Sequence, residues 1–255
     1  MNLFTPLRPA PSAPLARANP VAKLGAAAIL MTALFLSADP ITPGIVVLAL
    51  LAAVPFTGLK SRDLLARSWP LLLAALAVGI LNTVFAPERP AAESLVSGVG
   101  LGLRLLGIAM AGLLALATTD PTDLADALQQ QLHLSPRVAI GTLAAVRLLP
   151  IMASEWQALA LARRARGVDA GHSPLAAVRI AFGMLLALLV GAVRRGTRLA
   201  MAMEARGFGA LPCRSIARPQ RMHGRDWQLI AVALLVAGGA VAISLAAGSW
   251  RFVFG

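Results

Sequence analysis

Residues 95–117 read LVSGVGLGLRLLGIAMAGLLALA and form the longest apolar run of the chain. One charged side chain, Arg104, interrupts this run. A helix of about twenty apolar residues is long enough to cross the hydrocarbon core of a bilayer. The run therefore predicts a transmembrane helix, and we expect Arg104 to snorkel towards the outer surface of the membrane.

Further apolar runs flank this segment on both sides. They occupy residues 22–37, 41–57, 69–86 and 227–247. With 58% hydrophobic and 13% charged residues and a mean hydropathy of +0.77, the chain is too apolar for an ordinary soluble domain. We therefore expect an all-α integral membrane protein with about five transmembrane helices. Residues 21–118 hold the first four of these helices, and residues 227–255 hold the last.

Two regions of the chain have a different character. Residues 1–20 are rich in proline and predict a disordered cytoplasmic tail. Residues 119–226 contain fourteen of the 23 basic residues and two shorter apolar stretches, 138–152 and 180–193. Stretches of this length are more typical of buried or interfacial helices than of membrane spans. We therefore predict long amphipathic helices on the cytoplasmic membrane surface over residues 119–226.

The basic residues predict the orientation in the membrane. They gather in the N-terminal tail, between the second and third spans, and in residues 119–226, whereas the other loops are poor in them. The positive-inside rule then places the N-terminus inside and the C-terminus outside. Membrane topology thus explains the net charge of +12, and we expect no nucleic-acid partner. A transmembrane hairpin of residues 138–152 and 175–193 is the alternative, but it would place Arg163, Arg164 and Arg166 outside.

The most specific feature of the sequence is a repeated tripeptide. Ala165-Arg166-Gly167 and Ala205-Arg206-Gly207 each follow a helix-forming run. Glycine suits the left-handed position just after a helix, and arginine is favourable at a helix C-terminus. Either motif alone is explained by C-capping chemistry. Two copies on the same side of a membrane predict two similar docking tips.

The helices that carry these tips have recognisable ends. Pro136 suits the start of the first helix, which Pro150 should kink, and Ser173-Pro174 suits the start of the second. Five further residues are assigned a supporting role in these helices: Arg147, Pro150, Glu155, Arg163 and Glu204. We interpret the two glutamates as partners of nearby arginines rather than as catalytic acids.

The sequence resembles the T component, the transmembrane scaffold subunit, of energy-coupling factor (ECF) transporters. The resemblance covers roughly residues 18–247 and is most specific at the two Ala-Arg-Gly motifs. The stretches that carry it are Asn19-Pro20-Val21-Ala22-Lys23-Leu24, Asp39-Pro40, Thr119-Asp120-Pro121, Arg147-Leu148-Leu149-Pro150, Ala162-Arg163-Arg164-Ala165-Arg166-Gly167 and Met203-Glu204-Ala205-Arg206-Gly207-Phe208.

The resemblance implies a multi-pass protein of the bacterial cytoplasmic (inner) membrane that works in a complex. Its partners would be two ABC ATPase subunits and a membrane-embedded S component that binds a vitamin or a transition-metal ion. It also implies that Arg166 docks one ATPase subunit and Arg206 the other. Glycines at positions 98, 100, 102, 107 and 112 then have two interpretations, internal packing or contact with the S component.

Other kinds of site and function are less well supported. The chain has no glycine-rich phosphate loop, and we expect no ATP hydrolysis by it and no cofactor. Cys213 and the three histidines lack the spacing of a metal site. A membrane-embedded enzyme would need ionisable clusters within the spans. The permease subunit of an ordinary ABC importer and a non-catalytic membrane anchor remain as alternatives.

Overall fold

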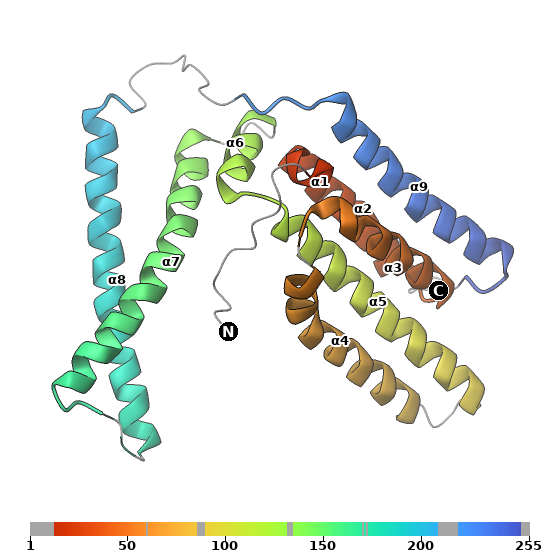
Figure 1. Cartoon of the computed structure of the whole chain (residues 1–255), viewed down its shortest axis with the longest axis horizontal. Coiled ribbons are helices and arrows are strands. Elements are labelled where there is room, and N and C mark those ends of the chain that lie inside the picture. The colour runs from red at the N-terminus through yellow and green to blue at the C-terminus, as the bar shows by residue number, and fades with distance from the viewer. Residues whose placement is uncertain are drawn as a thin grey trace. The chain divides into compact units, whose positions relative to one another are not determined.

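The computed structural model describes residues 13–59, 61–85, 90–131, 135–169, 171, 173–208 and 219–250. The elements found in this part of the chain are helices, as predicted for an all-α membrane protein (Figure 1). In chain order they are α1 Pro14–Arg17, α2 Pro20–Leu36, α3 Ile41–Ala53, the 3-10 helix η1 Val54–Thr57, α4 Ser61–Val84, α5 Ala91–Ala117, α6 Pro121–Gln131, α7 Pro136–Ala165, α8 Pro174–Ala205 and α9 Gly224–Ala246.

The structure corrects two of the predicted boundaries. The described end of the predicted tail is not disordered, because Pro14–Arg17 form α1, which packs on η1. The predicted loop between the second and third spans is helical from Ser61 onwards, and α4 continues through Pro70. Leu64 is buried in the core, so the added turns of α4 bury apolar surface that a loop would leave exposed.

The chain divides into two compact units. The first unit combines Met1–His133 with Gln220–Gly255, and the second is Leu134–Pro219. The predicted cytoplasmic region, residues 119–226, extends beyond the second unit at both of its ends. This difference arises because α6 packs on α2 and because Asp226 is bonded to Asn19 in the first unit. Charge pattern therefore locates the second unit only approximately, and packing sets its limits.

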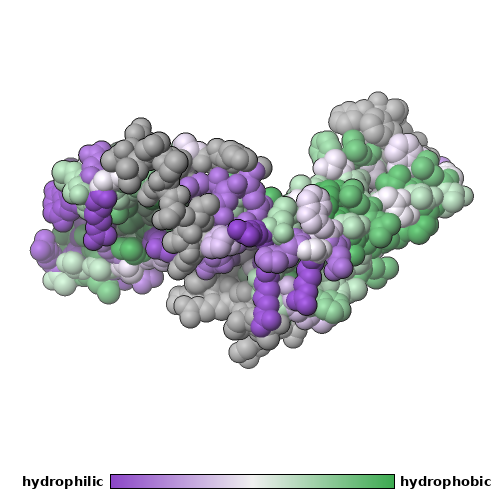
Figure 2. All heavy atoms as spheres, turned by 90° about the horizontal axis from the view of Figure 1, so that it is seen from above, coloured by the Kyte–Doolittle hydropathy of each residue, from purple (hydrophilic) through white to green (hydrophobic). Residues whose placement is uncertain are grey.

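The first unit is a helix bundle with α2 at its centre. Helix α2 contacts α3, α5, α6 and α9, and α4 packs on α5. Its core includes Leu30, Leu34, Val46, Ala111 and Ala237. The outward side chains are also largely apolar, and Figure 2 shows broad apolar surface over this bundle. Helices that are apolar on all sides are typical of membrane spans.

Three of the described helices are long and apolar enough to cross a membrane by length and composition. They are α5 over Ala92–Ala117, α8 and α9. Shorter apolar helices occupy Pro20–Leu36, Ile41–Thr57 and Ser68–Val84, which correspond to the first three predicted spans. The inclusion of α8 was not expected, because the short apolar stretch 180–193 had favoured a helix at the membrane surface. That surface position remains a prediction.

The glycines of α5 are all used in packing within the first unit. A Cβ atom at Gly98 would lie 2.5 Å from the Gly79 carbonyl oxygen of α4, and one at Gly102 would lie 3.0 Å from the Ala75 carbonyl oxygen. The remaining three face residues of α2, α3 or the turn between them: Gly100, Gly107 and Gly112. Of the two interpretations of these glycines, the structure therefore supports internal packing.

Arg104 is held by α2. Its guanidinium donates a hydrogen bond to the Phe35 carbonyl oxygen in the last turn of that helix, and it lies 5.5 Å from the centroid of the Phe35 ring. The last carbonyls of a helix have no partner within the helix and carry partial negative charge. Arg104 therefore caps α2, whereas the sequence had predicted only that it snorkels outwards.

Two buried polar clusters join α2 to other helices of the first unit. In the first cluster, Lys23 Nζ donates to the Thr118 carbonyl oxygen at 2.8 Å. In the same place Asn19 N–H donates to Asp226 Oδ1 at 2.7 Å, which ties the start of α2 to the start of α9. All four residues are buried. The buried ammonium of Lys23 and the buried carboxylate of Asp226 thus each have a partner, whereas Asn19 Nδ2 is buried without one.

The second cluster surrounds Asp39 in the turn between α2 and α3. Its carboxylate accepts hydrogen bonds from the Ser37 hydroxyl, from the Thr42 N–H and hydroxyl at 2.7 and 2.8 Å, and from the Ser244 hydroxyl at 2.7 Å. Burial acts to raise the pKa of Asp39, but these hydrogen bonds outweigh it and hold the pKa below its usual value. The Ser244 bond ties the far end of α2 to α9.

Candidate functional site

The first predicted tip ends α7. Gly167 has a φ of +78°, its N–H donates to the Arg164 carbonyl oxygen at 2.9 Å, and Val168 N–H donates to the Arg163 carbonyl oxygen at 3.0 Å. This pair of bonds is the Schellman ending of a helix, in which glycine takes the left-handed position. Arg166 is the C-cap residue, and its side chain is exposed.

The second tip repeats this geometry at the end of α8. Gly207 has a φ of +76°, its N–H donates to the Glu204 carbonyl oxygen at 2.9 Å, and Phe208 N–H donates to the Met203 carbonyl oxygen at 3.0 Å. Arg206 is again the exposed C-cap residue. The two copies of the tripeptide therefore form two matching local structures, each with an arginine at the same position.

The two tips lie at opposite ends of a helix pair. Figure 1 shows α7 and α8 as a crossed, antiparallel pair in the second unit, and the two helices contact each other. Helix α8 has 32 residues, so it is about 48 Å long at 1.5 Å per residue. Arg166 precedes the start of α8 and Arg206 follows its end. The two arginines are thus separated widely enough to contact two different proteins.

Glu155 and Arg195 form the main polar tie between α7 and α8. The contact is bidentate, with Arg195 Nη1 bound to Oε1 and Nη2 bound to Oε2 at 2.7 Å. The hydrogen bonds from Arg195 hold the pKa of Glu155 below its usual value. Glu155 is therefore paired with an arginine, and the sequence did not identify Arg195 as that partner.

Arg163 forms a second tie near the first tip. Its Nη1 donates to the Ile180 carbonyl oxygen of α8 at 2.9 Å. A Cβ atom at Gly183 would lie 3.2 Å from Arg163 Nη2, so the glycine leaves room for the guanidinium. Arg163 is therefore directed at α8, whereas the neighbouring Arg164 and Arg166 are exposed.

The remaining predicted supporting residues lie on the same two helices. Pro150 is inside α7, and the helix changes direction about midway along its length (Figure 1). A proline in a helix interior removes one backbone hydrogen bond and favours such a bend. Arg147 and Glu204 are exposed. The ion pairs of the described residues do not include Glu204, so the structure brings Glu155, but not Glu204, to an arginine.

The described part of the chain contains no metal-ligand cluster. No group of three or more His, Cys, Asp or Glu side chains lies close enough there to hold a metal ion. His133, His172 and Cys213 lie outside the described residues. What the described site offers chemically is a pair of exposed guanidinium groups on rigidly capped helix ends.

Comparison with known proteins assigns the chain to a family. Residues 11–215, which include both tips, match the family model CbiQ, described as "Cobalt transport protein". The energy-coupling factor transporter transmembrane protein EcfT of Heliobacterium modesticaldum is 30% identical over 251 residues, which cover 91% of this chain and 92% of that protein. EcfT of Exiguobacterium sibiricum is 28% identical over 254 residues, covering 92% of this chain and 95% of that protein. The chain therefore belongs to the family of transmembrane T components of energy-coupling factor transporters.

Proposed function

We propose that this chain transmits ATP-driven motion from two ABC ATPase subunits to a membrane-embedded S component in a bacterial cytoplasmic membrane. As a T component, it is a non-catalytic membrane subunit of the transporter. In this proposal the ATPase subunits hydrolyse ATP, and the S component binds the solute that is imported. The description of the matching family supports a transition-metal ion as one class of solute, and a vitamin is the other class that we propose.

The observation that carries the proposal is the structural duplication of the two tips. Both helices end in a Schellman motif, and both place an exposed arginine at the C-cap. Capping alone requires only the glycine, because its left-handed backbone makes the two closing hydrogen bonds. A repeated arginine at a matching position is better explained by two similar binding partners.

The chemistry of the tips suits a groove that contains a carboxylate. A guanidinium presents its donors in a planar fork that can form two parallel hydrogen bonds with one carboxylate. The alanine before each arginine and the glycine after it add little bulk, so the tip can approach a partner closely. We therefore propose that Arg166 enters one ATPase subunit and that Arg206 enters the other.

The test compares arginine variants of the complete transporter. The single variants Arg166→Ala and Arg206→Ala should each retain less ATPase on purification and import less solute, and the double variant should lose both properties. A hydrogen bond to a charged group contributes about 1.5–3 kcal/mol, which corresponds to roughly a tenfold to hundredfold loss of affinity at each tip. Arg→Lys should restore only part of the loss, because an ammonium group lacks the fork geometry.

Arg164→Ala is the matched control, because Arg164 is an exposed arginine in the same turn as the first tip. It should leave ATPase binding and import near those of the wild type. A double tip variant that imports solute normally would contradict the proposal and reduce the two motifs to helix caps. A complex with two copies of this chain would instead favour an ordinary ABC permease, whereas the proposal requires one copy with two ATPase subunits.

A further inference from the structure

The chain passes between the two units twice, and the two crossing segments are tied together within the first unit. The chain leaves this unit after α6 and returns to it at Gln220. Gln131 Nε2 donates to the Gln220 carbonyl oxygen at 3.0 Å, and Gln220 N–H donates to Gln130 Oε1 at 2.7 Å. We call Gln130, Gln131 and Gln220 the glutamine clasp. All three side chains are partly buried.

The clasp adjoins the two helices at the heart of the first unit. Helix α6, which carries Gln130 and Gln131, packs on α2. Helix α9 begins four residues after Gln220, and its Asp226 is bonded to Asn19 at the start of α2. A displacement of either crossing segment therefore acts on the same ends of α2 and α9.

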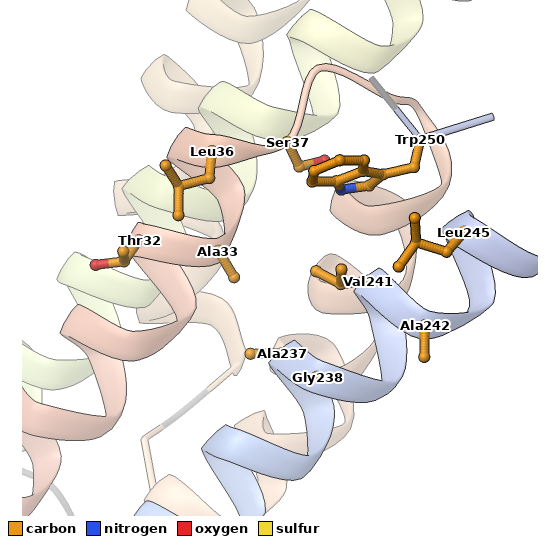
Figure 3. A pocket seen from close by; sticks show the side chains of 10 residues that line it. All are labelled: Thr32, Ala33, Leu36, Ser37, Ala237, Gly238, Val241, Ala242, Leu245 and Trp250. Carbon is orange, nitrogen blue, oxygen red and sulfur yellow. The ribbon is translucent and has the colours of Figure 1, made fainter. Parts of the chain in front are cut away.

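Helices α2 and α9 also enclose an apolar groove at their far ends. The groove has a volume of about 460 Å³. Figure 3 shows Ala33 of α2 and Val241 of α9 on its two sides, with Trp250 close to Ser37. Ala242 of α9 also lines the groove and is exposed. The separation of α2 and α9 therefore determines the width of the groove.

We propose that the glutamine clasp is the joint through which movement of α7 and α8 reaches the first unit, and that this movement changes the width of the groove between α2 and α9. The inference rests on the proposed function, since it assumes that ATPase subunits move the second unit. With the clasp closed, the end of α6 and the residues before α9 move together and displace α2 and α9. Without the clasp, the end of α6 and the start of α9 move separately, and less of the movement reaches the groove.

The experiment measures the width of the groove in the complete transporter purified with its ATPase subunits in lipid nanodiscs. Ala242→Cys, in a Cys213→Ser background, introduces a single cysteine of this chain into the groove. Its rate of reaction with a membrane-permeant maleimide measures how wide the groove is. The rate is compared without nucleotide and with ATP plus vanadate. The wild-type clasp should give an ATP-dependent change in this rate.

Gln131→Glu is the main test variant, because a carboxylate cannot donate to the Gln220 carbonyl oxygen. It should lower the equilibrium constant for closing the clasp about fivefold, the factor expected for the loss of one net hydrogen bond, and so reduce the ATP-dependent change in the labelling rate. Gln131→Leu removes the same donor without adding charge and should act in the same direction. ATPase binding and ATP hydrolysis should stay near wild type in both variants, since Gln131 does not lie at a tip.

Two charge-matched controls separate the clasp from a general effect of added charge. Gln130→Glu keeps an oxygen that accepts from Gln220 N–H, and Gln129→Glu places the same charge next to the clasp. Both should preserve the ATP-dependent change. If Gln131→Glu and Gln131→Leu retain the full ATP-dependent change while the ATPase subunits are bound and active, the proposed role of the clasp is wrong, and the proposed function is unaffected. Failure of the wild-type chain to bind ATPase subunits would overturn the proposed function and this inference with it.

Discussion

At the scale of single residues, the glycine that follows each tip arginine determines where its helix ends. Gly167 and Gly207 have φ values of +78° and +76°, a region that other residues enter only at a cost. The adjacent arginine is held on a backbone closed by two hydrogen bonds. A guanidinium on such a fixed base loses less conformational freedom on binding than one on a frayed helix end.

Gly167→Ala and Gly207→Ala should therefore loosen the last turns of α7 and α8. The left-handed position disfavours alanine by about 1 kcal/mol. The amide hydrogens that form the closing hydrogen bonds should therefore exchange with deuterium several times faster. Gly141→Ala is the matched control, because Gly141 lies inside α7 and a Cβ atom there meets open space. That variant should slow exchange in α7, and faster exchange there than at the tips would contradict the assignment.

At the scale of helices, the first unit relies on close backbone approach and the second on charged ties. Helices α4 and α5 meet at Gly79, Gly98 and Gly102. In contrast, α7 and α8 are joined by Glu155 with Arg195 and by Arg163 with the Ile180 carbonyl oxygen. The first kind of contact is rigid, whereas an ion pair with exposed atoms allows two helices to shift with little loss of energy.

Gly98→Ala should destabilise the contact between α4 and α5. A Cβ atom at this position would lie 2.1 Å from Thr83 Oγ1 and 2.5 Å from the Gly79 carbonyl oxygen, so the helices must separate. Overpacking of this kind costs about 1–3 kcal/mol, which should lower the melting temperature of the purified protein in detergent. Gly44→Ala, at a helical position with open space around it, should leave the melting temperature unchanged or raise it slightly.

The Glu155–Arg195 tie should have a small, salt-dependent coupling energy. Both side chains are about one-third exposed, and ion pairs that are open to solvent and salt contribute little to stability in double-mutant cycles. The cycle uses Glu155→Gln, Arg195→Gln and the double variant, with thermal unfolding as the measurement. Because the pKa of Glu155 is lowered in the folded state, the tie persists above the usual carboxyl pKa and is lost only as the pH falls below it. A coupling unaffected by salt would show that the tie is not ionic.

At the scale of the whole molecule, the placement of the second unit relative to the membrane decides between two topologies. Five spans keep both tips on the cytoplasmic side, whereas seven spans would put Arg166 outside. Asp169→Cys in a Cys213→Ser background distinguishes the two arrangements, and Ala247→Cys in the same background is the external control; both positions are exposed. An impermeant thiol reagent added to intact cells should label position 247 and leave position 169 unlabelled. External labelling of position 169 would establish the seven-span arrangement.

The parts of this structure that depend on neighbouring residues were predictable, and those that depend on distant residues were not. Asp120 caps α6, Ser173 caps α8, and both tip glycines are left-handed, as their local sequences indicate. In contrast, Arg195 lies 40 residues from its partner Glu155, and Ser244 lies 205 residues from Asp39. A single sequence does not identify such pairs, because any serine or arginine of the chain could be the partner until the packing of the helices is known.

The fastening of α2 to α9 has a consequence for the way the protein is made. Asp39 finds its Ser244 donor only after 205 further residues have been synthesised, and Asn19 meets Asp226 after a similar delay. At roughly 5–20 residues per second, this interval is on the order of 10–40 s on the ribosome. During that time Asp39, in the turn after α2, lacks one of its final hydrogen-bond donors. Completion of the first unit is thus a late event, and a ribosome that stalls before α9 leaves Asp39 and Asn19 without the partners that α9 supplies.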